Sequence, residues 1–266
     1  MSEDSVFTWT FEPKNLFRLG EGLIECELGA YRLIIRDGQV EAVVPDLRTI
    51  EGWPNVHDIK KELRHGVERF LDSRAIWTHE TYQLSYEREA IPEASEDELD
   101  HVLRVTATAK AKIQGHAEIQ VRGPDGDLIG DSRDVRKRQS KEFGRLTHRY
   151  YERDRTAYFI IRRYRAAIED PDNEFIHLFD ILEALKDRFD ERSSDIRQRL
   201  GIEKDKFKTF CILANNPDEK PVRQGRHRGR NIEELRDASE AELSVARQVA
   251  RELVFGYLQF LDEQES

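Results

Sequence analysis

An acid-free basic run near the end of the chain contains the residue types most suited to chemistry. Lys220 to Arg230 reads KPVRQGRHRGR, with four arginines, one lysine and one histidine in eleven residues. Like charges at this spacing repel one another, so folding alone gives no reason to gather them. The run therefore predicts contact with an anion, either an acidic face of the protein itself or a partner that carries phosphate.

His227 lies within this run, directly between Arg226 and Arg228. Neighbouring positive charge favours the neutral form of an imidazole, and guanidinium groups suit the recognition of phosphate. A neutral imidazole beside arginines is what a ribose 2′-hydroxyl needs to attack its own phosphodiester, with arginine stabilising the charge that develops. In this interpretation His227 is the general base or acid, and Arg223 and Arg226 hold the scissile phosphate.

Four more polar residues of the same region have supporting roles in this interpretation. Arg228 and Arg230 position the RNA backbone through their guanidinium groups. Asn215 and Asn216 lie at the end of the preceding apolar segment, where their amides could orient the imidazole. The hypothesis therefore combines a catalytic set with a phosphate-binding set.

A non-catalytic alternative explains the same arginines. They would form a brace against carboxylates of this protein, such as Asp180 and Glu183, or dock against an acidic partner. The helical half would then serve as a dimerisation or docking module. The residue types alone leave both interpretations open.

Charge is unevenly distributed along the chain. The net charge is −10, which argues against general coating of nucleic acid, yet Arg133 to Arg165 contains twelve basic and four acidic residues. Together with Lys220 to Arg230, this stretch concentrates positive charge in two places on an otherwise acidic molecule. We expect the basic stretch to track RNA, which would add a salt-dependent contribution to affinity.

Other sequence features exclude several classes of protein. Cys26 and Cys211 lie far apart within apolar runs, as buried free thiols of a reducing cytosol do. The N-terminus MSEDSVFTW has no signal-peptide pattern, and no apolar run approaches the length of a membrane span. Glycine-rich phosphate loops and paired cysteines are absent from the sequence, so we expect no metal and no cofactor in a cytoplasmic protein.

Period-two alternation predicts strands at the start of the chain. Phe7 to Phe11 alternates aromatic with polar residues, as in a half-buried strand, and Leu23 to Glu27 is a weaker case. Tyr31 to Arg36 and Gln39 to Val44 flank Asp37-Gly38, a dipeptide that accepts the positive φ angles of a type I′ turn. These two segments predict a β-hairpin.

A helix and further strands follow this hairpin. Apolar residues at steps of three and four predict a helix from Val56 to about Asp72, and Ile76 to Glu87 is predicted to return to a strand. Alternation over Leu103 to Val121 predicts a second hairpin with one solvated face.

From about Ser132 the apolar spacing becomes helical and stays so. Residues 132–155 are highly charged, which predicts an exposed or linking helix. Further helices are predicted over residues 158–168, 174–189, 194–201 and 207–214 and from Ser239 to the end. Ser239 and Glu242 have the spacing of a capping box, and Gly201 is a natural terminator of the short helix before it.

These elements predict an α+β protein. Strands followed by helices, without alternation, favour an N-terminal, mostly antiparallel β domain with one helix and a C-terminal all-α bundle. We place the β-rich domain at residues 1–131, a basic linker helix at residues 132–157 and the helical domain at residues 158–266.

The helical half resembles the C-terminal domains of HEPN-like proteins, those of the ApeA type being nearest. The resemblance is carried by YRAAIEDP from Tyr164, FIHLFDILEAL from Phe175, Leu200-Gly201, LANNP from Leu213, and Arg226-His227-Arg228. It implies a bundle that often forms a homodimer and, in active members, cuts RNA without metal through an arginine and a histidine separated by four to six residues.

The spacing in this chain departs from that pattern. Three residues separate Arg223 from His227, and the one pair at the family's spacing, Arg74 and His79, lies in the half predicted to form the sheet. The resulting hypothesis is an RNA-binding or RNA-cleaving protein of microbial defence or RNA metabolism. Its N-terminal domain would act as a sensor or adaptor.

Overall fold

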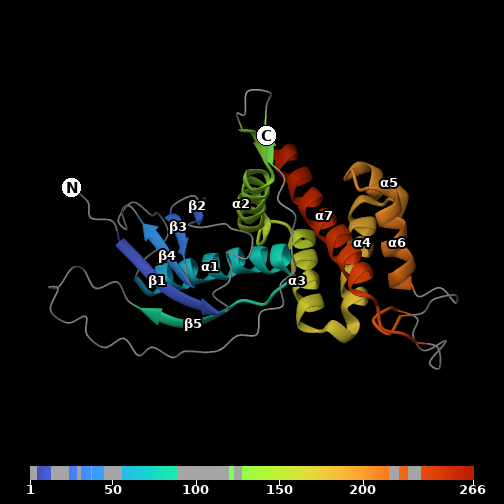
Figure 1. Ribbon diagram of the computed structural model, residues 1–266. Coiled ribbons are helices and arrows are strands. Elements are labelled where there is room, and N and C mark those ends of the chain that lie inside the picture. The colour runs from blue at the N-terminus through green and yellow to red at the C-terminus, as the bar shows by residue number, and fades with distance from the viewer. Residues whose placement is uncertain are drawn as a thin grey trace.

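The computed structural model describes residues 5–12, 24–28, 31–36, 38–44, 56–88, 120–122, 128–215, 222–226 and 235–266. Within these residues the fold is α+β, as the sequence predicted, with an antiparallel sheet followed by helices. Figure 1 shows the sheet at one end of the molecule and the later helices at the other, with α1 running between them.

The sheet has strand order β2-β3-β4-β1-β5 in the part of the chain that the structure describes, and each neighbouring pair is antiparallel. Its strands are β1 (Ser5–Glu12), β2 (Ile24–Leu28), β3 (Tyr31–Arg36), β4 (Gln39–Val44) and β5 (Gln83–Arg88). The predicted hairpin is confirmed, and Gly38 has the positive φ of 82° that its turn requires. Phe7, Trp9 and Phe11 are buried on one face, which confirms the alternation.

Helix α1 (Val56–Thr78) covers that face and then enters the helical bundle. Val67 and Ala75 pack with the sheet, whereas Ile76 belongs to the core of the bundle. The predicted helix end at Asp72 and the strand start at Ile76 are therefore wrong. The last turns stay helical because both cores bury them, and the helix ends at His79, which has a left-handed φ of 57°.

The bundle is built from the helices that follow a short hairpin of β6 (Gln120–Arg122) and β7 (Leu128–Asp131). Its helices are α2 (Ser132–Tyr150), α3 (Arg155–Glu169), α4 (Glu174–Phe189), α5 (Ser193–Arg199), α6 (Lys204–Asn215) and α7 (Glu240–Glu265). A short 3₁₀ turn over Pro171–Asn173 joins α3 to α4. The predicted hairpin over residues 103–121 lies almost entirely outside the described residues.

Helix α2 is more buried than its charge indicated. Phe143, Leu146 and Tyr150 are at most 1% exposed and pack into the core of the bundle. Gly144 brings the α2 backbone close to α1, because a Cβ added there would lie 3.1 Å from the Phe70 ring. The expectation of an exposed helix is therefore wrong, since one apolar stripe is enough to seat a helix whose other faces are charged.

Local end signals set the helix boundaries. The Asp154 side chain accepts a hydrogen bond from the Ala157 amide at the start of α3. The predicted capping box is confirmed, with Ser239 and Glu242 exchanging side-chain-to-backbone hydrogen bonds at the start of α7. Gly201 has a φ of 67° after α5, as the helix-end prediction required.

Candidate functional site

Of the basic run predicted to hold the catalytic group, the structure describes residues 222–226. His227, Arg228, Arg230 and Asn216 lie outside the described residues. Arg223 and Arg226 lie within them, and both contact this protein. Arg223 donates from Nε to Asp237 Oδ1 at 3.0 Å, and the Arg226 guanidinium lies 5.0 Å from the centre of the Phe179 ring.

Backbone hydrogen bonds hold these two arginines in place. The Arg223 amide donates to the Arg236 carbonyl at 2.9 Å, next to an isolated bridge between Val222 and Arg236. The Arg226 amide donates to the Ala214 carbonyl at the end of α6, also at 2.9 Å. The described part of the loop is therefore pinned at both arginines.

The other residues predicted for this region have local partners. Asn215 donates from its side chain to the Cys211 carbonyl at 3.0 Å, one turn back on α6. Asp180 lies 3.6 Å from Arg163, and Glu183 pairs with Lys186 at 3.0 Å. The expectation that Asp180 and Glu183 receive the arginine loop is therefore wrong for Arg223, whose described carboxylate partner is Asp237.

Part of the predicted basic stretch is neutralised by the last turns of α7. Asp262 accepts hydrogen bonds from Arg145 at 2.8 Å and from Arg149 at 2.6 Å, and Arg149 also pairs with Glu265 at 2.8 Å. The arginines hold the pKa of Asp262 below its ordinary range, chiefly through the hydrogen bond from Arg145. These two arginines therefore join α2 to α7.

The outward face of α3 differs, because it has arginines and aromatic rings without acids. No acidic residue occurs in the sequence from Arg155 to Ile168. Tyr158 and Phe159 are 49% and 38% exposed, large fractions for aromatic side chains. Steps of three and four place these residues with Arg162 and Arg163 on one face of the helix. The Arg163 guanidinium lies 5.0 Å from the Phe159 ring centre.

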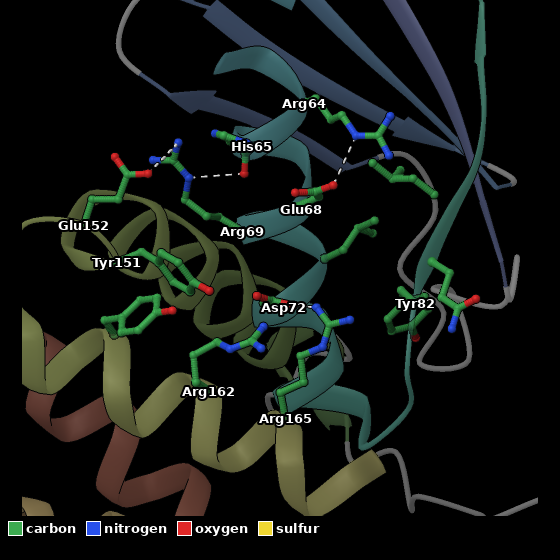
Figure 2. Close-up of a pocket in the computed structure, with 14 residues that line it drawn as sticks. Arg64, His65, Glu68, Arg69, Asp72, Tyr82, Tyr151, Glu152, Arg162 and Arg165 are labelled. Atoms are coloured by element: carbon green, nitrogen blue, oxygen red, sulfur yellow. Dashed lines mark hydrogen bonds and ion pairs between the residues drawn. The ribbon is translucent and has the colours of Figure 1, made fainter. Parts of the chain in front are cut away.

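A cavity of about 620 Å³ opens beside this face, between α1, α3 and the chain leading into β5. Figure 2 shows side chains from α1 and α3 converging on it. Its polar lining consists of cationic, phenolic and carboxylate side chains. The main ones are Arg64, Arg69, Arg162 and Arg165, then Tyr82, Tyr151 and Tyr158, then Glu68, Asp72 and Glu152.

Three of these four arginines pair with carboxylates: Arg64 with Glu68 at 3.2 Å, and Arg165 and Arg69 with two carboxylates each. Arg165 pairs with Asp72 across the cavity and with Glu169 on its own helix at 2.7 Å. Arg69, whose side chain is 8% exposed, lies 2.7 Å from Glu62 and 3.3 Å from Glu152. These pairs join α1 to α3 and to the end of α2, and so fix the walls of the cavity.

Arg162 is in a different position. Its guanidinium projects from α3 toward Asp72 in Figure 2, yet no carboxylate of the described residues lies within ion-pair distance of it. It interacts with the Tyr151 hydroxyl, and burial raises the pKa of Tyr151 to about 12, so the phenol stays protonated. Arg162 is therefore an available cation on the edge of the cavity.

Burial also shifts the pKa of Asp72, the carboxyl group toward which Arg162 projects. The side chain is 6% exposed, and desolvation raises its pKa although Arg165 and Arg162 act in the opposite direction. Because Arg165 occupies the carboxylate, Asp72 contributes little uncompensated negative charge to the cavity.

The arginine and histidine at the spacing of the HEPN-like motif lie inside the protein. Arg74 is 1% exposed and contacts the Ser140 hydroxyl. His79 Nε2 lies 3.4 Å from Glu174 Oε1, and burial lowers the pKa of His79 to about 3, with Arg247 contributing. Both residues thus contact α2 and α4 in the interior of the bundle. Their surroundings match a structural role.

Sequence reasoning missed the cavity. Its walls come from Arg64 to Asp72 and from Tyr151 to Arg165, more than 75 residues apart in the chain. The available signal in the sequence was the stretch from Arg155 to Ile168, which has arginines and aromatic residues but no acid. In the part of the chain that the structure describes, no three histidine, cysteine or carboxylate groups are close enough to hold a metal ion.

No described helix combines the length and apolar character needed to cross a bilayer. Comparisons of the chain with protein-family models, with curated proteins and with solved structures found no match. The functional argument therefore relies on the geometry of the site.

Proposed function

We propose that this protein binds RNA along the outward face of α3, in the cytoplasm, in microbial defence or RNA metabolism. The observation that carries the proposal is the pairing of exposed aromatic rings with arginines on a helix face that has no acid. Single-stranded nucleic acid is bound by such surfaces, since bases stack on the rings while cations follow the phosphates. Guanidinium groups suit this task because they bind phosphate and stack on bases.

The ion pairs remove some of the other arginines from consideration. The arginines of α2 at positions 145 and 149 are neutralised by α7, and Arg223 is paired with Asp237. Arg162 has no ion pair among the described residues. Lys137, Arg138 and Lys141 on the first half of α2 are also exposed cations, so the exposed rings of Tyr158 and Phe159 beside the arginines are what favour α3.

Fluorescence anisotropy with labelled single-stranded RNA tests this proposal. We expect Arg155→Ala and Phe159→Ala each to weaken binding, and Arg155→Ala to reduce the slope of log affinity against log salt by about 0.7, the value for one phosphate contact. Arg192→Ala is the matched control, because that side chain is 88% exposed on the linker before α5. Equal effects of Arg155→Ala and Arg192→Ala would refute the assignment to α3.

Cleavage at His227 is a separate part of the hypothesis. It requires Arg223 to exchange Asp237 for a phosphate, and both partners of that pair are exposed, 57% and 75%. Exposed ion pairs are worth about 0–1 kcal/mol, so the exchange is inexpensive. Incubation with RNA in EDTA should give cleavage by the wild type and none by His227→Ala. Intact RNA with both proteins would remove the catalytic role and leave RNA binding by α3 untouched.

The brace is a second candidate role for the arginine loop, favoured by the contact of Arg226 with Phe179. A cation–π contact of this kind is worth about 0.5–1 kcal/mol at an exposed site. If it is the purpose of the loop, Arg226→Ala should lower stability by that amount while RNA binding stays unchanged. The helical half would then be an interaction module. Sedimentation velocity would test the homodimer that the HEPN-like resemblance implies.

A further inference from the structure

The cavity between α1 and α3 is a feature that RNA tracking along a helix face does not require. Its volume of about 620 Å³ lies within the range of small-ligand sites. It is also located where the sheet-covering helix meets the bundle, and such junctions are common places for ligand sites. An open helix face would bind the RNA backbone without any enclosed space.

Two cationic groups on opposite walls are placed to meet an anion. Arg162 comes from α3 and forms no ion pair among the described residues. Arg64 comes from α1 and pairs with Glu68 at 3.2 Å, with both side chains 44% exposed. Such an exposed pair on one helix is weak and gives way to a phosphate.

The aromatic part of the lining suits a planar ring. Tyr151 and Tyr158 meet edge to face, with ring centres 5.1 Å apart, and both line the cavity. Tyr158 is 49% exposed, so its ring is open to a nucleobase. Stacking on such rings is tolerant of base identity, because every base has a π-face.

The carboxylates of the lining limit the charge of the ligand. Glu68 and Glu152 lie at the rim, 44% and 60% exposed, and Asp72 is occupied by Arg165. Glu62 and Glu169 next to the lining also pair with Arg69 and Arg165, so the positive charge open to a ligand comes from Arg162 and from the exposed Arg64. That balance suits a single phosphate monoester, since a triphosphate would bring more negative charge than the arginines can compensate.

From this lining we infer that the cavity binds a nucleoside monophosphate, with its phosphate between Arg64 and Arg162 and its base against Tyr158. The ligand is either a free nucleotide or the 5′-phosphorylated end of an RNA. The second source rests on the proposed function, because Tyr158 and Arg162 belong to both surfaces and an RNA on α3 would lead its end into the cavity.

Calorimetry with adenosine 5′-monophosphate tests the site independently of RNA. We expect binding by the wild type, a loss of about tenfold or more in Arg64→Gln and in Arg162→Gln, and no change in Arg192→Gln, an exposed arginine outside the lining. Adenosine serves as the phosphate-free control in thermal shift. The nucleotide should raise the melting temperature of the wild type where adenosine does not. Absence of nucleotide binding together with equal melting shifts would overturn the inference.

Short RNAs with a 5′-phosphate or a 5′-hydroxyl distinguish the two sources. Tighter binding of the phosphorylated RNA, lost in Arg64→Gln, supports the RNA end. Binding of the free nucleotide with equal affinity for the two RNAs supports the free source. If the nucleotide binds and RNA does not, the cavity assignment stands and the proposed RNA binding fails. If both RNAs bind equally and the nucleotide does not bind, RNA binding stands and the cavity assignment fails.

Discussion

The guanidinium of Arg247 holds the carboxylate of Glu174 by two hydrogen bonds, 2.6 Å from Nε and 2.9 Å from Nη2. The Glu174 side chain is 2% exposed, and its Oε1 also lies 3.4 Å from His79 Nε2. This pair joins α7 to the start of α4 and to the residue that ends α1. Three segments that are distant in sequence thus share one buried charge pair, next to Tyr164 of α3, whose ring centre lies 5.9 Å from that of His79.

Breaking this pair should destabilise the protein strongly. Arg247→Met leaves the Glu174 carboxylate buried without its partner, which typically costs about 3–5 kcal/mol. Urea unfolding measures the loss, and Arg192→Ala, an exposed arginine, should stay within about 0.5 kcal/mol of the wild type. The double variant Arg247→Met with Glu174→Met should regain most of the stability. A cost below about 1 kcal/mol for Arg247→Met alone would contradict the structural role.

His79 should make the fold sensitive to acid. Burial, with Arg247 and Arg251, lowers the pKa of His79 to about 3, whereas an unfolded chain has a histidine pKa of about 6.5. Between these values the unfolded state binds a proton that the folded state does not, so stability falls as the pH drops through this window. His79→Asn keeps a residue that tolerates the left-handed φ and removes the titration.

Unfolding free energies of the wild type and His79→Asn at pH 7.5, 6.0 and about 4.5 test this linkage. The variant should lose less stability than the wild type over this series. Some loss will remain, because burial also lowers the pKa of His148 to about 4. Parallel curves for the two proteins would rule out His79 as a source of the acid sensitivity.

The capping box at the start of α7 gives a smaller and more local prediction. Ser239→Ala removes the acceptor of the Glu242 amide and should cost about 1 kcal/mol. Ser244→Ala, an exposed site within the same helix, is the matched control and should be neutral or slightly stabilising, because alanine favours helix. Equal effects at the two serines would show that the cap contributes nothing.

Glu242 adds a dependence on pH at the same cap. The hydrogen bond from Arg236, followed by those with Ser239, lowers the pKa of Glu242 to about 2. A depressed carboxyl pKa contributes stability above its unfolded value of about 4.3, and this contribution is lost as the pH falls toward 2. Wild type should therefore lose more stability than Glu242→Gln between pH 5 and pH 2, in unfolding curves followed by circular dichroism.

Gly66 is required by the packing of α1 on the sheet. A Cβ at this position would overlap the Tyr31 hydroxyl and lie 2.9 Å from the ring carbon that bears it. Gly66→Ala should destabilise by about 1–3 kcal/mol through overpacking, more than the gain of about 1 kcal/mol from helix propensity. The Tyr31 hydroxyl has no hydrogen-bond partner among the described residues, so Tyr31→Phe alone should be close to neutral. Adding Tyr31→Phe to Gly66→Ala should recover part of the loss in thermal unfolding.

The sequence by itself determined the local elements. Alternation in Phe7 to Phe11 and the Asp37-Gly38 turn predicted strands that the structure contains, and Ser239 with Glu242 predicted the start of α7. Such features depend on neighbouring residues and on the period of one element, so the local sequence is enough to predict them.

Tertiary structure alone decided the partners of those elements. Packing against both cores extended α1 to Thr78, and packing in the bundle buried the apolar stripe of the charged helix α2. It also brought Arg64 and Arg162 to opposite walls of one cavity. The sequence pattern could not supply these results, because ion pairs and cavities depend on distances between segments that packing sets and local periodicity does not encode. The surplus of arginine was visible in the sequence, whereas the fold decided that Arg162 has no ion pair among the described residues.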